Sequence, residues 1–253
     1  SVIFYHEIYQ SKMKVAHLIS SQIFAGIEQH VFELSSFMSD VSDQVIICDE
    51  SICHHMVGMK TKSLKIGSRY SPLNIYKLIK FLNAHNISIL HCHGDKASFI
   101  GKGVKIFTNI KIVSTIQVHK KNNNSFTSMD AVIGVNKLLV KDIPKGTYIP
   151  NWFNPSHDGK KSSRSGSIIA IGRLEKVKGF DQLIKSWVNI KEKLEIIGSG
   201  PEEQQLTQLI HDLNLADQIK IVTNCDYNSI EAKYKTASGL IVSSHREGGP
   251  RDL

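Results

Sequence analysis

Arg173 and Lys178 are the residues whose type and position first point to chemistry. They follow residues 167–171, an apolar and β-branched run that stops at Gly172, as a buried parallel strand does at a tight turn. Ligands of parallel α/β sheets bind outside the carboxyl ends of the strands, where helix N-termini offer unpaired N–H groups. Two cations at this edge indicate a phosphate ester as ligand. The competing interpretation is a pair of solvated surface charges, the usual fate of Lys and Arg.

A predicted β-α-β unit positions these two cations. After Gly179 the sequence shows the i, i+3, i+4, i+7, i+8 apolar spacing of an amphipathic helix, formed by Phe180, Leu183, Ile184, Trp187 and Val188. A second strand is predicted at residues 194–197. Pro201 is expected as the first residue of a further helix that runs to Leu213, because proline suits that position.

The remainder of the chain predicts the same alternation of strands and helices. In the second half we expect a strand at 218–222, a short helix at 230–234 and a strand at 239–243. In the first half, helices are expected after Gly26 and from Ser71-Pro72. Strands there are expected at 14–20, 44–48, 88–92, 111–116, 131–135 and 147–149, with a weak one near Leu64. This pattern predicts an α/β protein built from two Rossmann-like domains.

The expected domain boundaries follow from composition. Residues 1–12 precede the first convincing strand and read as an upstream or added segment. Residues 13–153 form the first domain, and residues 167–253 the second. Between them, residues 154–166 are rich in Ser, Gly and Lys, which is typical of a linker.

The charge of the chain is unevenly distributed. The net charge is +8, and residues 1–150 hold 17 Lys and Arg against 10 Asp and Glu, a net of +7. A basic first half favours peripheral contact with an anionic membrane or an anionic acceptor. We expect no nucleic-acid partner, since no basic motif is interleaved with aromatic residues. No apolar run is long enough to span a membrane and no signal peptide is recognisable, so a cytoplasmic location is expected by default, at most peripheral to the membrane's inner face.

Cysteine and histidine patterns argue against a metal centre or a disulfide framework. The four cysteines are scattered without a C-x-x-C pair and read as small core residues in a reducing compartment. His91 and His93, together with His54 and His55, lack a carboxylate or thiolate at ligand spacing. The sequence therefore predicts no metal.

Several motifs, in order and spacing, resemble the retaining GT-B glycosyltransferases of family 4, the group 1 glycosyl transferases. The second half carries the more specific ones, GRLEKVKG at 172–179, IIGSGPE at 196–202 and SSHREGGP at 243–250. The first half adds AGIE at 25–28, HCHG at 91–94, His119 and Pro150-Asn151. The resemblance spans nearly the whole chain and implies two Rossmann-like domains that face each other across a cleft.

The resemblance also implies roles for individual residues. Arg173 and Lys178 would hold the diphosphate of a nucleotide-sugar donor, in agreement with the first interpretation above. Gly26 would let backbone N–H groups approach the same phosphates, because it has no Cβ. His119 would lie beside the reacting centre. Glu247 would contact the donor sugar, with the backbone amides of Gly248 and Gly249 beside it. The donor is then a substrate, and no cofactor is expected.

The resemblance implies transfer of a sugar, with retention, to an acceptor held by the first domain, a cell-envelope glycan or glycolipid. The second glutamate of the family's E-x7-E pattern would fall two positions beyond Leu253, so we expect the second domain to be truncated. The alternatives are a GT-B nucleotide-sugar epimerase and a catalytically inactive nucleotide-binding fragment. A basic nucleic-acid binder is the third choice.

Overall fold

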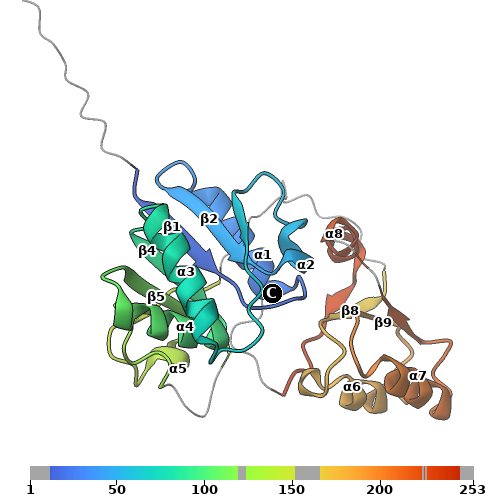
Figure 1. Ribbon diagram of the computed structural model, residues 1–253. Helices are drawn as coiled ribbons and strands as arrows, with labels where there is room; N and C mark the ends of the chain where they lie inside the picture. The colour runs from blue at the N-terminus through green and yellow to red at the C-terminus, as the bar shows by residue number, and fades with distance from the viewer. Residues whose placement is uncertain (1–11, 119–123, 152–165, 224, 226, 246–253) are drawn as a thin grey trace, which may run out of the picture. The chain divides into compact units, whose positions relative to one another are not determined.

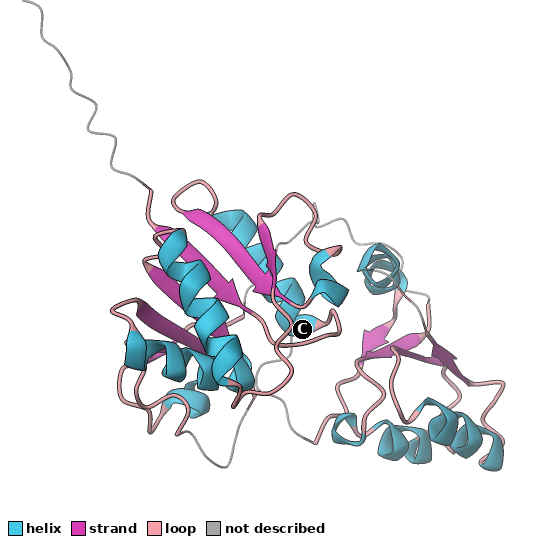
Figure 2. Ribbon diagram, in the orientation of Figure 1, coloured by secondary structure: helices cyan, strands magenta, loops and turns pink. Residues whose placement is uncertain are grey.

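The computed structural model describes residues 12–118, 124–151, 166–223, 225 and 227–245. Contacts divide the chain into two compact units, Ser1–Trp152 and Phe153–Leu253, and each is described by itself. Both units consist of a parallel sheet with flanking helices (Figures 1 and 2). Within the described ranges, no helix is long and apolar enough to cross a membrane.

The first unit is built on a seven-stranded sheet in the order β3-β2-β1-β4-β5-β6-β7. All of its neighbouring strands are parallel. The strands are β1 (Lys14–Leu18), β2 (Asp43–Cys48), β3 (Thr61–Ser63), β4 (Ile89–His93), β5 (Lys111–Ile116), β6 (Ala131–Gly134) and β7 (Gly146–Tyr148). The first strand, β1, lies inside the sheet, and the strand order reverses between β1 and β4. Such a reversal is where ligands of doubly wound folds bind.

Helices cover both faces of this sheet. The helices are α1 (Gly26–Met38), α2 (Glu50–Cys53), α3 (Pro72–Ala84), α4 (Gly94–Phe107) and α5 (Lys137–Val140). Successive residues of β2 show the two faces, because side chains alternate along a strand. Ile47 joins the core formed with α3 and α4, whereas Ile46 joins a smaller core with α1 and α2.

Capping residues explain where two of these helices begin. Ser71 accepts a hydrogen bond from the Asn74 amide, 3.4 Å away, and Pro72 occupies the first turn of α3. At the start of α1, the Glu28 carboxylate accepts a hydrogen bond of 2.9 Å from the Ala25 amide. Both features are local in sequence, and the predicted start of α3 at Ser71-Pro72 is confirmed.

The second unit has a four-stranded parallel sheet in the order β10-β9-β8-β11. The strands are β8 (Ile168–Ile171), β9 (Leu194–Ile197), β10 (Ile219–Val222) and β11 (Gly239–Leu240), and the helices are η1 (Lys176–Lys178), α6 (Phe180–Ser186), α7 (Glu203–Asp212) and α8 (Tyr227–Thr236). One core packs α6 and α7 against the sheet, and a smaller one packs α8 on the opposite face. Strand order reverses here between β8 and β11.

Some expectations of the sequence need correction. Val188 is 49% exposed, so the buried stripe of α6 ends at Trp187. Pro201 lies in a turn ahead of α7, which begins at Glu203 after the cap residue Glu202. The strand predicted at 239–243 comprises only Gly239 and Leu240. The predicted linker 154–166 falls outside the described residues apart from Gly166.

Candidate functional site

The candidate site lies at the carboxyl edge of the second sheet, where the strand order reverses. The segment after β8, residues 172–179, leaves the sheet beside the segment after β11, residues 241–245. The strands β9 and β11 flank β8 on opposite sides, so the connections that leave β8 and its neighbours run in opposite directions. In sheets of this kind, ligands bind in the crevice between such connections.

Direct contacts join these two segments. Ser243 donates a hydroxyl hydrogen bond of 2.8 Å to the Lys178 carbonyl, and the His245 amide donates one of 2.9 Å to the Val177 carbonyl. Gly179 lies between them with a φ of +65°, and a Cβ there would stand 2.4 Å from the Ser243 carbonyl oxygen. The turn after η1 therefore requires glycine, for conformation and for space.

Arg173 and Lys178 both lie on the segment that follows β8. The methylene stem of Lys178 lies over Gly172, since a Cβ built on that glycine would be 3.3 Å from Lys178 Cε. The Arg173 guanidinium is half exposed and pairs with Glu175 at 2.7 Å. Exposed pairs of this kind contribute little free energy, typically below about 1 kcal/mol. Replacement of Glu175 by a more highly charged anion as the partner of Arg173 therefore costs little free energy.

The segment after β9 supports this turn from the other side. Gly172 donates its amide hydrogen to the Ile197 carbonyl at 3.0 Å, which continues the ladder between β8 and β9. A Cβ built on Gly198 would lie 1.9 Å from the Gly172 carbonyl oxygen, and Gly198 has a φ of +150°. The two strand ends can approach this closely only because residue 198 has no side chain.

The remaining residues predicted for the donor site have different outcomes. Gly26 is the first residue of α1 in the other unit, and a Cβ added to it would meet nothing within 4 Å. Four predicted residues, His119, Glu247, Gly248 and Gly249, lie outside the described residues. The expectation of a facing cleft concerns how the units are placed, and it stays a prediction.

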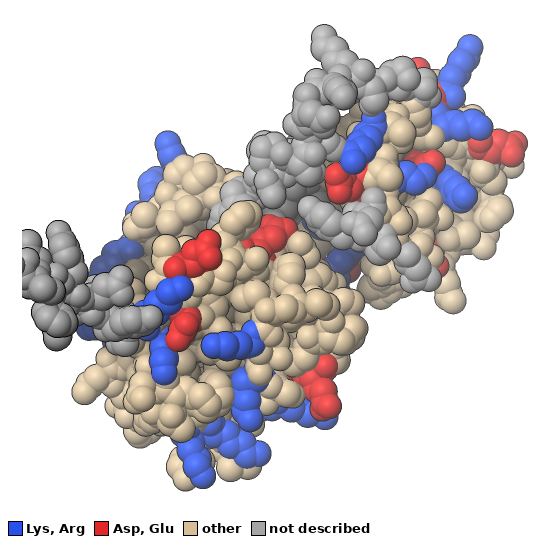
Figure 3. Space-filling view, turned by 90° about the horizontal axis from the view of Figure 1, so that it is seen from above, with Lys and Arg blue, Asp and Glu red and all other residues tan. Residues whose placement is uncertain are grey.

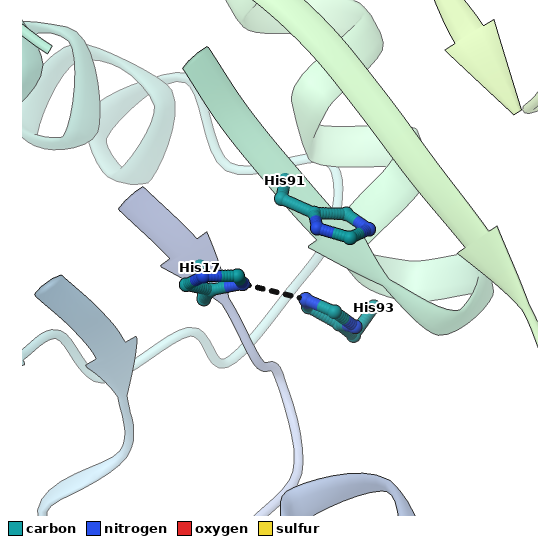
Figure 4. Close-up of side chains that lie close together, drawn as sticks. All are labelled: His17, His91 and His93. Carbon is teal, nitrogen blue, oxygen red and sulfur yellow. Dashed lines mark hydrogen bonds between the residues drawn. The ribbon is translucent and has the colours of Figure 1, made fainter. Parts of the chain in front are cut away.

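A buried group of three histidines occupies the strand reversal of the first unit. His17 on β1 and His91 on β4 are direct neighbours across the two strands, and His93 ends β4 (Figure 4). Their side chains are between 2% and 8% exposed. In the described part of the chain this is the one group whose ring nitrogens lie close enough, within 4.8 Å, to share a metal ion.

Hydrogen bonds to protein partners hold most of this arrangement, whereas the buried His93 Nδ1 has no hydrogen-bond partner among the described residues. His17 Nδ1 lies 3.0 Å from His93 Nε2, and His17 Nε2 lies 2.7 Å from Gln44 Oε1. Gln44 donates through Nε2 to Ser42, so its oxygen faces His17 as an acceptor. His17 therefore carries its proton on Nε2, and His93 donates to it. His91 Nε2 contacts the Thr115 hydroxyl at 2.7 Å.

Burial keeps these three imidazoles neutral. It lowers the pKa of His17 to about 4, partly opposed by the hydrogen bond to Gln44. The pKa values of His91 and His93 also fall well below the ordinary value through burial, and the neighbouring histidines, including His30, add to the effect.

Sequence reasoning missed His17. It paired His91 and His93 with His54 and His55, whereas His54 and His55 stack on each other with ring centroids 4.0 Å apart. The available signal was a histidine inside the otherwise apolar stretch VAHLI of a predicted strand, where each side chain points to one face of the sheet. The expectation that the chain binds no metal stays a prediction.

Known proteins match this chain over part of its length. Residues 156–253 match the family described as glycosyl transferases group 1. An uncharacterized glycosyltransferase of Haemophilus influenzae is 31% identical over 106 residues, which span 40% of this chain and 29% of that protein. The amylovoran biosynthesis glycosyltransferase AmsD of Erwinia amylovora is 27% identical over 120 residues, 43% of this chain and 34% of its own length. The matched segments thus cover about a third of each relative.

Solved structures extend the likeness to nearly all of the chain. Sucrose-phosphate synthase from Thermosynechococcus elongatus superposes with a TM-score of 0.74 at 14% identity, over 95% of this chain and 77% of that one. Anabaena HepE, in complex with UDP and glucose, gives 0.73 at 15% identity, over 92% and 74%. At these identities the likeness shows the fold. The chain therefore has the GT-B fold, and its residues 156–253 match the model of the glycosyl transferases group 1 family.

Proposed function

We propose that the protein transfers a sugar from a nucleotide diphosphate sugar to an acceptor, and that the donor diphosphate binds Arg173 and Lys178. The observation that carries this proposal is the position of both cations on one segment at the strand reversal of the second unit, with the Lys178 side chain over Gly172, the neighbour of Arg173. Negative charge develops on the leaving diphosphate during transfer, and fixed cations and amides stabilise it. The names of the matching relatives favour a transferase over an epimerase.

The remaining roles in the proposal follow the resemblance. Gly26 adds backbone amides toward the phosphates, and Glu247, Gly248 and Gly249 contact the donor sugar. His119 acts beside the reacting carbon, so His119→Ala is expected to lower turnover far more than donor binding. Transfer proceeds with retention. A cell-envelope glycan or glycolipid is the proposed acceptor, in keeping with the amylovoran biosynthesis named for one relative.

Removal of either cation tests the proposal. Arg173→Ala and Lys178→Ala are each expected to weaken UDP or GDP binding about a hundredfold, since charge-assisted hydrogen bonds contribute roughly 1.5–3 kcal/mol each. Titration calorimetry measures the change. Lys176→Ala is the matched control, a cation on the same short helix that we give no role, and it should bind as the parent does. Parent-like affinity in either test variant would refute the diphosphate assignment.

We also propose that the first unit contacts an anionic membrane at the inner face. A groove of about 540 Å³ between β3 and α3 is lined by four lysines, with Leu64 and Phe81 among its apolar residues. The lysines are Lys62, Lys65, Lys77 and Lys80. Figure 3 shows basic side chains gathered at one edge of the surface in view.

Vesicle sedimentation measures this contact. Vesicles that contain phosphatidylglycerol should bind the protein, and each surface lysine near an anionic bilayer contributes about 1 kcal/mol. Exchange of Lys77 and Lys80 for glutamine should therefore reduce binding more than tenfold. A matched double exchange of Lys191 and Lys193, in the second unit, should leave it unchanged. Equal binding to neutral and anionic vesicles would contradict the proposal.

A further inference from the structure

Two thiols meet at the carboxyl end of β2 in the first unit. Cys48 is the last residue of that strand and Cys53 is the last residue of α2, and their sulfur atoms lie 3.0 Å apart. A disulfide bond is about 2.05 Å long, so the sulfurs need to approach by only about 1 Å. The sequence spacing C-x4-C gave no sign of this, because a strand end and a helix end turn the two side chains toward each other.

The two thiols differ in reactivity. Cys48 is fully buried, whereas Cys53 is partly exposed. Burial raises the pKa of the Cys48 thiol, and its contact with Cys53 raises it further, so Cys48 stays protonated. Cys53 Sγ also lies 3.3 Å from the Asp49 carbonyl oxygen. Because a thiol must be accessible to react with a solute, an oxidant meets Cys53 first.

We propose that Cys48 and Cys53 are a redox modification site, which a peroxide converts to a reversible intramolecular disulfide. The Cys53 sulfur attacks the O–O bond of hydrogen peroxide, which gives a sulfenic acid and one water. The Cys48 sulfur then attacks the Cys53 sulfur. The S–S bond forms, the S–O bond breaks, and the departing hydroxide takes the Cys48 proton as the second water. Both thiols are oxidised and the peroxide is reduced.

The position of α2 gives the disulfide a structural consequence. Ser51 donates a hydrogen bond of 3.0 Å to the Gln22 carbonyl, and Gln22 Nε2 donates one of 3.3 Å to the Asp49 carboxylate. The rings of His55 and Phe24 lie 4.5 Å apart. These contacts hold α2 against the segment that leads into α1, so a covalent link from α2 to β2 restrains that segment as well.

Mapping the disulfide in the peroxide-treated chain tests the proposal. We expect the intact mass to fall by about 2 Da, the two hydrogens lost, with a peptide that links Cys48 to Cys53, and a thiol reductant should restore both thiols. Cys225→Ser is the matched control because Cys225 is also partly exposed, and it should keep the link. Cys53→Ser and Cys48→Ala should lose it.

Two results would overturn the proposal, and neither depends on a variant that folds. The first is a native chain whose thiols are consumed by peroxide without any Cys48–Cys53 peptide. The second is a native chain in which links to Cys92 or Cys225 predominate, as expected for an unfolded chain whose four cysteines pair without selection.

Discussion

Between about pH 6.5 and pH 4 the first unit should lose stability steeply. His17, His91 and His93 are buried and neutral in the folded state, with lowered pKa values, whereas an unfolded histidine titrates near 6.5. Their contribution to the free energy of unfolding is therefore fully present above about pH 6.5. It is lost as the pH falls toward the pKa values of the folded state, because in this range only the unfolded chain binds the protons. Each histidine adds about 1.4 kcal/mol per pH unit to the slope of unfolding free energy against pH, so the three together add about 4 kcal/mol per pH unit.

Urea unfolding at a series of pH values measures this slope. His17→Gln should reduce it by about a third, since one of three groups is removed. His211→Gln is the matched control, because His211 is exposed on α7 and should leave the slope unchanged. A slope below about 1.4 kcal/mol per pH unit in the parent would show that the three imidazoles are not held neutral.

Gly198→Ala should destabilise the second unit by about 3 kcal/mol or more. The added Cβ would stand 1.9 Å from the Gly172 carbonyl oxygen, which is backbone and has no rotamer through which to move away. The φ of +150° adds backbone strain. Strain and overpacking each cost roughly 1–3 kcal/mol. Because Gly172 precedes Arg173, the shift should also weaken nucleotide binding.

The fluorescence of Trp187 measures the unfolding of this unit. It is 2% exposed in the core of the second unit, and in a Trp152→Phe background it is the single tryptophan of the chain. Gly239→Ala is the matched control in the same sheet, since a Cβ there meets only Ile168 Cγ1 at 3.9 Å. It should change stability by less than about 1 kcal/mol. Equal stability of the two variants would contradict the close approach of β8 and β9.

Long strands and strongly periodic helices were predictable from the sequence. Residues 111–116 and 194–197 are apolar, β-branched and bounded by polar residues or turns, and the structure has β5 and β9 at these positions. Helices α2 and α5 were not predicted, because four residues are too few to show a helical period. Val188 continues the apolar spacing of α6, yet its side chain is exposed because the helix ends at Ser186, before this residue.

The site was predictable where its residues lie close together in sequence. Arg173 and Lys178 belong to one turn, so the strand before them sufficed to place both at a sheet edge. Contacts between distant segments carried no such signal. The approach of Ser243 to Lys178, the meeting of His17 with His93 and the Cys48–Cys53 contact all depend on how separate elements pack. Periodicity along the chain does not encode that packing.

The turn that carries Arg173 is held by backbone hydrogen bonds on both sides. Leu174 donates its amide hydrogen to the Ser199 carbonyl and accepts one from the Glu202 amide, each at 3.0 Å. Ordering a free backbone costs roughly 1–2 kcal/mol of conformational free energy per residue, and in this turn the backbone is already ordered by folding. Binding of a diphosphate therefore needs to order only side chains, which preserves more of the interaction energy as affinity. The same bonds join the turn to the start of α7, so the two should move as one rigid body.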